Sequence, residues 1–582
     1  MAAIPVYSQQ FYIRGEVKDE SGSLLQNVNI LLHSTGYIYH SGTEGSFGIL
    51  TNRQKDSLSF SLDGYQKQTI VSTADNFISV KLKMLSVNAS ALRRDKLASL
   101  TNNLTRESQR EWFTGDETYA SIVENRFVEA RKYPSTDVSL NIDRASYSNI
   151  RRFITMGTLV PPDAVRIEEM LNYFNNNYNQ PQGKNLFDIR SVITNSPWNE
   201  ANHLFFINVS SQKMNLDSLP ASNLVFLIDI SGSMDMPNRL PLLKSAFRLL
   251  VNNLREKDTV SIVVYGGAVG TMLNPTSGAE KEKIIKAIDE LTPGGATPGE
   301  SGIRLAYKLA ASHFIKNGNN RVILATDGDF NVGLKKEEDL EEMIVHQRQT
   351  GIYLTCLGVG MGNYKDSKIQ SLARKGNGNF AYLDNYREAE KVLLQEFTQT
   401  LYAVADDVYM NIRFNPKYVK EYRLIGFDNK VGALKDSLSS IEGGEVGSGQ
   451  SMMAVFEIVP SDKTSGAGSD NVSENYADVR LQYKMPGSHN GEKNFLYSSS
   501  FQVVPFADLQ NSYRFSSAVI MLGSVLKQSS VMKNINWNDI ISIASQSAQP
   551  GNLSQQEFIN LVQQAKILYS KKRKKKDLNS DF

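Results

Sequence analysis

Three short segments of the sequence carry carboxylates and hydroxyls that could bind a cation. The five side chains are Asp229, Ser231 and Ser233 in DISGS, Thr297 in GGATPGE, and Asp327 in LATDGDF. An all-oxygen set with two charges suits a hard cation such as Mg²⁺, with Mn²⁺ or Ca²⁺ as alternatives, and disfavours soft metals. The six histidines are scattered without ligand spacing, so nothing indicates a zinc site.

Alternating apolar strands and amphipathic helices must position these segments. Residues 224–228 are a continuous apolar run that ends at Asp229, which predicts a central parallel strand buried on both faces. Further helices are predicted at 240–254, 280–291 and 299–315, and further strands at 259–265, 321–326 and 351–358. This order predicts a doubly wound, Rossmann-like α/β sheet, in which ligands bind beyond the carboxyl ends of the strands.

The spacing DxSxS, then Thr, then Asp resembles the metal-ion-dependent adhesion site of von Willebrand factor type A (vWA) domains. The resemblance implies that Ser231 and Ser233 bind the metal directly and that Thr297 does so directly or through water. It implies mainly water-mediated roles for Asp229 and Asp327, with an open position for an Asp or Glu carboxylate of a partner protein. DxSxS alone would also fit a strand end whose serine caps the next helix, but the complete set is more specific.

The resemblance extends beyond this domain. DVSLNIDRASYSNIRRFI, VRIEEMLNYF, GNGNFAYLDN and FNPKYVKEYRLIGFDN are similar to segments of bacterial YfbK-type vWA proteins, over roughly Gly115–Tyr569. That family implies a vWA domain between an N-terminal extension and a C-terminal domain, without established catalysis. Residues 11–84 alternate in short runs that predict a β-sandwich, and their layout resembles carboxypeptidase regulatory-like (transthyretin-like) domains of exported bacterial envelope proteins.

At 582 residues the chain is too long for one hydrophobic core. We divide it into 1–10, a possible remnant of an export signal; 11–84, the β-sandwich; 85–111, a linker; 112–221, the vWA-associated extension; 222–404, the vWA domain; 405–570, a C-terminal domain of strands and then two helices; and 571–582, a basic tail. Within the C-terminal range, Ser554 and Glu557 are expected to cap the last helix.

Composition limits the partners. The formal charge of +2 implies no general attraction to nucleic acid or anionic membranes, and no apolar run reaches the ~18 residues of a membrane-spanning helix. We expect a cell-envelope location, periplasmic or secreted, with a cytoplasmic location as the alternative. The tail KKRKKK at 571–576 is expected to be a solvated end, with peripheral contact to anionic lipid as the alternative.

Other chemistry finds little support. Cys356 lies in an apolar run and is expected in the core. The segment GGEVGSGQS has the glycine spacing of a phosphate-binding loop, but Gln450 replaces the lysine that such a loop requires, so we expect a glycine-rich hairpin. Asp143 and the pair Glu168 and Glu169 are expected on solvated helix faces or caps. Two alternatives to a binding module remain: a structural envelope protein with an unoccupied site, and a Mg²⁺-dependent hydrolase with an aspartyl nucleophile. The second lacks the acid that such enzymes place two residues after the nucleophile, where this chain has serine.

Overall fold

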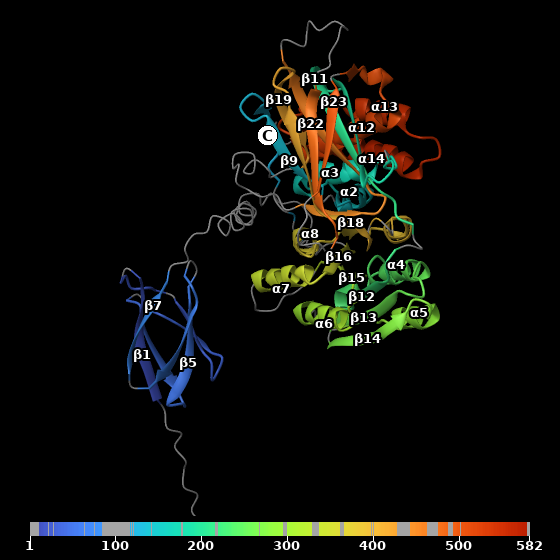
Figure 1. The fold of residues 1–582 in the computed structure, drawn as a ribbon. Coiled ribbons are helices and arrows are strands. Elements are labelled where there is room, and N and C mark those ends of the chain that lie inside the picture. Colours follow the sequence, from blue (N-terminus) through green and yellow to red (C-terminus); the bar gives the residue numbers. More distant parts are fainter. Residues whose placement is uncertain are drawn as a thin grey trace, which may run out of the picture. The chain divides into compact units, whose positions relative to one another are not determined.

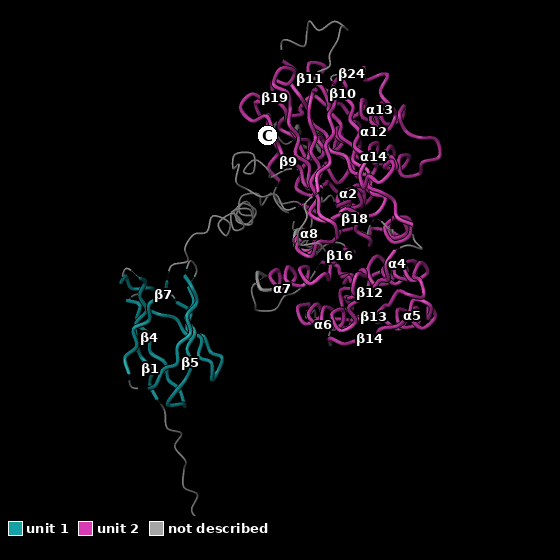
Figure 2. Tube along the Cα trace, viewed as in Figure 1, with its two compact units in different colours: residues 1–100 teal, residues 101–582 magenta. Residues whose placement is uncertain are grey.

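A computed structural model describes residues 11–83, except 21, 27, 43, 63–64 and 75, together with 117 and 119. It also describes 122–578, except 141–142, 176–177, 216–218, 267, 295–298, 329–336, 361–365, 397–398, 400, 428–442, 462–474, 487–492 and 501. The chain divides into two compact units, residues 1–100 and 101–582 (Figure 2). The linker predicted at 85–111 lies outside the described residues.

The first unit consists of two β-sheets around one core. Its strands are β1 (Phe11–Asp19), β2 (Asn29–Leu32), β3 (Ile38–His40), β4 (Ser46–Thr51), β5 (Lys55–Ser61), β6 (Gln68–Thr73) and β7 (Phe77–Leu82). The sheet orders are β4-β1-β7 and β3-β2-β5-β6. Alternate residues of β1 are buried, so Ile13 and Val17 face Ile30, Leu58 and Phe60 of the other sheet. The period-2 pattern of the sequence therefore does produce a sandwich.

The second unit contains the predicted α/β sheet. Its strands are β12 (Ser222–Asp229), β13 (Thr259–Gly266), β14 (Ala268–Ser277), β15 (Asn319–Thr326), β16 (Ile352–Gly358) and β17 (Phe380–Tyr382). The order is β14-β13-β12-β15-β16-β17, and Figure 1 labels the first five of these strands. Every pair is parallel except β13 with β14. Because β12 lies between β13 and β15, the chain reverses its direction of winding there. The carboxyl ends of β12 and β15 form the switch point.

Helices cover both faces of this sheet. They are α4 (Leu240–Asn252), α5 (Lys281–Asp289), α6 (Gly299–Ser312), α7 (Glu337–Gln349), α8 (Asp366–Lys375) and α9 (Tyr386–Glu390), the last followed by the π-helical turn η5 (Lys391–Gln395). Leu224, Phe226 and Ile228 pack with α4, α5 and α9, whereas Val225 and Leu227 pack with α6, α7 and α8. All eight residues of β12 are buried, which explains its continuous apolar run.

The rest of the second unit forms three layers. Its strands are β8 (Val128–Glu129), β9 (Ser135–Ser139), β10 (Phe187–Ser196), β11 (Asn199–Ser211), β18 (Ala403–Phe414), β19 (Val419–Ile425), β20 (Gly444–Gly447), β21 (Ser451–Pro460), β22 (Asn475–Lys484), β23 (Lys493–Ser500) and β24 (Val503–Val504). Its helices are α2 (Ala145–Thr155), α3 (Ile167–Tyr173), α12 (Asn511–Lys527), α13 (Trp537–Ser547) and α14 (Leu553–Leu578). One sheet has the order β24-β10-β11-β21-β19-β8, and the other has the order β20-β18-β22-β23 with β9 beside β18.

Strand β11 shows how the layers meet. Leu204 and Phe206 face the helices, while Phe205 and Ile207 face the second sheet. Strands that precede the α/β sheet in the sequence thus pair with strands that follow it in both β-sheets, and they pack around one core. Among the described residues, no helix is both long and apolar enough to cross a membrane.

Three local predictions from the sequence are wrong. The turn after β20 is no hairpin, because β20 pairs with β18 and β21 pairs with β11 and β19; Gln450 accepts a hydrogen bond from Gly447 N at 2.9 Å and holds the turn. Helix α14 begins at Leu553 and is capped by Asn552, whose Oδ1 accepts from Gln555 N at 3.1 Å. Three helices, not two, follow the strands, and α14 continues through Leu578 into the basic run.

Two of the three carboxylates that we expected on solvated helix faces or caps are buried instead, whereas Glu168 is half-buried. Asp143 and Glu169 are 2% and 1% exposed, and Gln370 Nε2 donates to both at 3.0 Å. Arg166 pairs with Glu169 and, at 2.6 Å, with Asp366 of α8. These groups join α3 to the α/β sheet, so their role is structural.

Candidate metal site at the edge of the sheet

Asp229 occupies the tip of the central strand and is fully buried. Its Oδ1 accepts a hydrogen bond from Ser231 N at 2.8 Å, and its Oδ2 accepts one from Thr326 Oγ1 at 3.2 Å. Burial raises the pKa of Asp229 to about 6, and the nearby charge of Asp327 adds to the rise. A neighbouring cation would stabilise the ionised form of a carboxylate in this environment.

The loop after Asp229 turns its two serine hydroxyls toward each other. Ser231 Oγ and Ser233 Oγ are 3.1 Å apart, and Met234 N donates to Ser231 O at 3.0 Å to close the turn. The loop packs tightly on the end of β13, where Gly266 has a φ of +148° and a Cβ would meet Ser231 N at 2.5 Å. Glycine is therefore required at position 266.

Asp327 follows β15 directly, and its side chain is completely buried. Arg239, the residue before α4, donates from one guanidinium nitrogen to Asp327 Oδ2 and to Ser233 O, both at 2.6 Å. This arginine links the loops after β12 and β15. Its place in the site could not be inferred from the sequence, where it is one basic residue at the start of a helix.

The structure thus brings together Asp229, Ser231, Ser233 and Asp327 at one edge of the sheet, as we predicted from the strand ends. Thr297 lies outside the described residues. The described chain before it reaches Gly294, whose N donates to Ile230 O at 2.7 Å. The role of Thr297 stays a prediction.

The donor set fits a small hard cation. Adjacent ligands of an octahedral Mg²⁺ ion, with bonds of about 2.0–2.1 Å, lie about 2.9 Å apart. The two serine oxygens, at 3.1 Å, are close to this separation. Within the described part of the chain, no group of three or more His, Cys, Asp or Glu side chains could hold a metal. Hydroxyls together with two carboxylates remain the candidate ligands.

Other candidate groups offer no comparable arrangement. Cys356 is fully buried in β16, and burial holds the pKa of its thiol well above the ordinary value, so it belongs to the core as predicted.

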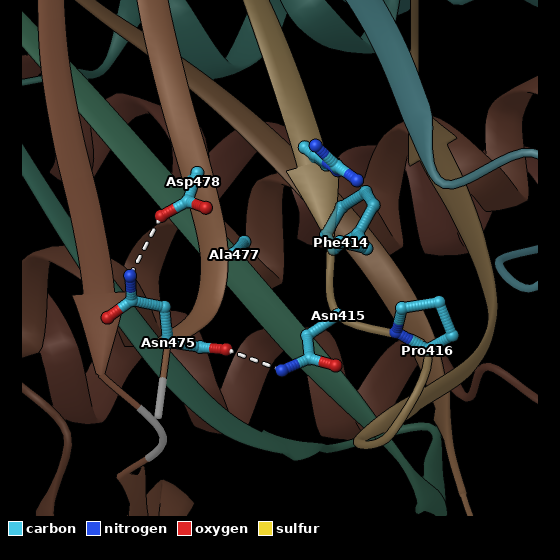
Figure 3. Close-up of a pocket in the computed structure, with 7 residues that line it drawn as sticks. Phe414, Asn415, Pro416, Asn475, Ala477 and Asp478 are labelled. Carbon is cyan, nitrogen blue, oxygen red and sulfur yellow. Dashed lines mark hydrogen bonds between the residues drawn. The ribbon is translucent and has the colours of Figure 1, made fainter. Parts of the chain in front are cut away.

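A pocket of about 440 Å³ lies at the ends of β18 and β22 (Figure 3). There Asn415 Nδ2 donates to Asn475 O at 3.1 Å, and Asn475 Nδ2 donates to Asp478 Oδ1 at 3.0 Å. Ser498 Oγ also donates to that carboxylate, at 2.7 Å. Because these polar groups already bond to one another, we assign no chemistry to the pocket.

Comparison with known proteins identifies the parts of the chain. A family model described as von Willebrand factor type A domain matches residues 223–399. Models described as von Willebrand factor and as Uncharacterized protein YfbK, C-terminal, match 113–205 and 399–568. The uncharacterized protein YfbK of Escherichia coli K12 is 36% identical over 473 residues, which are 78% of this chain and 81% of that protein.

More distant similarity is confined to part of the chain. Inter-alpha-trypsin inhibitor heavy chain H2 of Mesocricetus auratus is 27% identical over 209 residues, which are 34% of this chain and 21% of that protein. A solved von Willebrand factor type A structure from Catenulispora acidiphila has a TM-score of 0.38 at 13% identity, and the match covers 64% of this chain and 89% of that one. On the strength of the long match to the Escherichia coli protein, the chain belongs to the YfbK family of von Willebrand factor type A proteins.

Proposed function

We propose that the edge of the α/β sheet binds one divalent cation, Mg²⁺ by preference, and that this ion holds an acidic side chain of a partner protein. The observation that carries the proposal is the pairing of Ser231 Oγ and Ser233 Oγ at 3.1 Å beside two buried carboxylates. Neutral hydroxyls leave a bound cation electron-poor, so that it attracts a further anionic ligand.

The exposure of the loop agrees with a binding surface. Ser233 is exposed, and Met236, three residues further along the chain, is 47% exposed. A partner that presents a carboxylate to the ion would therefore also meet an apolar side chain. Exposed methionines adapt readily to different contact surfaces.

Hydrolysis is the less favoured function. Asp229 is 0% exposed, and its carboxylate oxygens bond to Ser231 N and Thr326 Oγ1 instead of facing a cleft. Ser231 stands where an aspartyl phosphatase needs its acid. We propose a non-enzymatic module; its placement at the cell envelope stays a prediction from the sequence.

Peptide binding tests the proposal. The full chain is probed with an array of 12-residue peptides that each carry one central glutamate, beside the same peptides with glutamine. We expect binding that needs both glutamate and Mg²⁺, that is lost in chelator, and that is lost in Ser231→Ala. The matched control is Ser245→Ala, because Ser245 Oγ donates to Pro241 O of its own helix, at 3.1 Å. Binding that persists in chelator, or in Ser231→Ala, contradicts the proposal.

A further inference from the structure

Arg239 is a charged residue of the site for which the metal-binding pattern has no role. Its side chain is 10% exposed, and the side chain of Asp327, its ion-pair partner, is 0% exposed. The same guanidinium nitrogen bonds Ser233 O, the backbone of a candidate ligand. Arginine keeps its positive charge under all ordinary conditions. A permanent positive charge therefore lies next to the position that the divalent cation would occupy.

A third segment fixes this guanidinium. Gly360 has a φ of +81°, and a Cβ there would lie 2.5 Å from Arg239 Nε. Tyr382, fully buried on β17, donates its hydroxyl to Gly360 O and holds that turn. Gly360 thus packs directly against Arg239, which leaves the guanidinium little room to move away on this side when a metal ion enters.

The charges of the site follow from these contacts. Among the described groups named above, the carboxylates of Asp229 and Asp327 and the guanidinium of Arg239 together carry one net negative charge. A divalent cation then makes the site positive by one charge, and a carboxylate from a partner makes it neutral. Without Arg239, the divalent cation alone would neutralise the two carboxylates. The metal-loaded site would then attract an acidic partner much less strongly.

We propose that Arg239 determines the specificity of the site for acidic partners. Its charge weakens the binding of the divalent cation and leaves the metal-loaded site positive, so that an anionic ligand is preferred. This inference rests on the proposed function, and it adds that metal affinity and partner affinity respond in opposite directions to the same residue.

Calorimetry on the chelator-stripped full chain tests this. In Arg239→Gln we expect Mg²⁺ to bind at least about tenfold more tightly, because a like charge close to the ion has been removed. At saturating Mg²⁺, we expect the best glutamate peptide from the array to bind at least about fivefold more weakly. Arg239→Lys keeps the charge and should stay within about threefold of wild type in both measurements.

The control variant is Arg248→Gln on α4, the helix that Arg239 precedes, because Arg248 and Asp289 form a pair whose side chains are 51% and 39% exposed. It should change neither affinity. If Arg239→Gln binds Mg²⁺ no more tightly than wild type, the inference is wrong and the proposed function stands. If neither protein binds Mg²⁺, the proposed function fails, and the inference fails with it.

A second measurement needs no variant, in case Arg239→Gln does not fold. Saturating glutamate peptide should raise the Mg²⁺ affinity of the wild-type chain at least about fivefold, whereas its glutamine counterpart should leave it unchanged. Equal effects of the two peptides would overturn the charge argument.

Discussion

Arg151 on α2 is a residue whose removal should strongly weaken the attachment of the α/β sheet to the rest of its unit. Its guanidinium donates to both oxygens of Asp384, at 2.8 and 2.5 Å, and to Glu388 at 2.8 Å. It also pairs with Glu557 of α14 at 2.9 Å. One side chain thus joins the end of the sheet, the start of α9 and the last helix. We consider the substitution Arg151→Met.

The magnitude follows from the burial of the carboxylates. The side chains of Asp384 and Glu388 are 8% and 3% exposed, and both would lose their guanidinium partner. Removing one member of a buried ion pair typically costs about 3–5 kcal/mol, because the remaining charge is poorly solvated. Glu557 is 33% exposed and can regain water, so it should add little.

Differential scanning calorimetry measures the effect. Arg151→Met should lower the main transition by several degrees, or divide it into two transitions as the α/β sheet unfolds separately. The control is Arg304→Met, because Arg304 and Glu300 form a pair on the surface of α6 whose side chains are 46% and 20% exposed; it should cost well under about 1 kcal/mol. Equal and small shifts in both variants would refute the reasoning.

Three further predictions concern buried groups. Burial, and then the charge of Glu169, raise the pKa of Asp143 from 3.8 to about 6. The stability from this raised pKa is complete only well below pH 4 and is lost as the pH rises through 6. Urea unfolding should therefore show Asp143→Asn gaining about 2 kcal/mol of stability relative to wild type between pH 4 and 7.5. Gly266→Ala should lower Mg²⁺ affinity in calorimetry by at least about tenfold, because its Cβ would displace Ser231 N; unchanged affinity would contradict the loop geometry. Cys356 should react with a thiol reagent only after unfolding, since its side chain is buried.

The sheet and four of its candidate ligands could be predicted from local patterns. The apolar run of β12 needs burial on both faces, and a polar residue at its end can only lie at the carboxyl edge, so Asp229 was placed without knowledge of any partner. Strand β14 escaped prediction because an antiparallel edge strand has one neighbour and a mixed pattern. The family resemblance added roles for the ligands, and these stay predictions.

The residues that were missed or misplaced depend on distant partners. In the sequence alone, Asp143 and Glu169 look like solvated carboxylates. In the fold both accept hydrogen bonds from Gln370, which is 227 residues from Asp143 and 201 residues from Glu169. Arg239 meets Asp327 across 88 residues, and nothing in the spacing distinguishes it from an ordinary first residue of a helix. Such contacts are set by the packing of whole elements, which no local pattern encodes.

A Mg²⁺ titration of the chelator-stripped chain by calorimetry, with Asp229→Ala beside it, tests the central claim most directly. We predict saturable binding of one ion in the wild-type chain and none in the variant, because the variant removes one of the two buried carboxylates of the site. The absence of binding at millimolar Mg²⁺, or equal binding in both proteins, would contradict a metal-dependent function for this edge of the sheet.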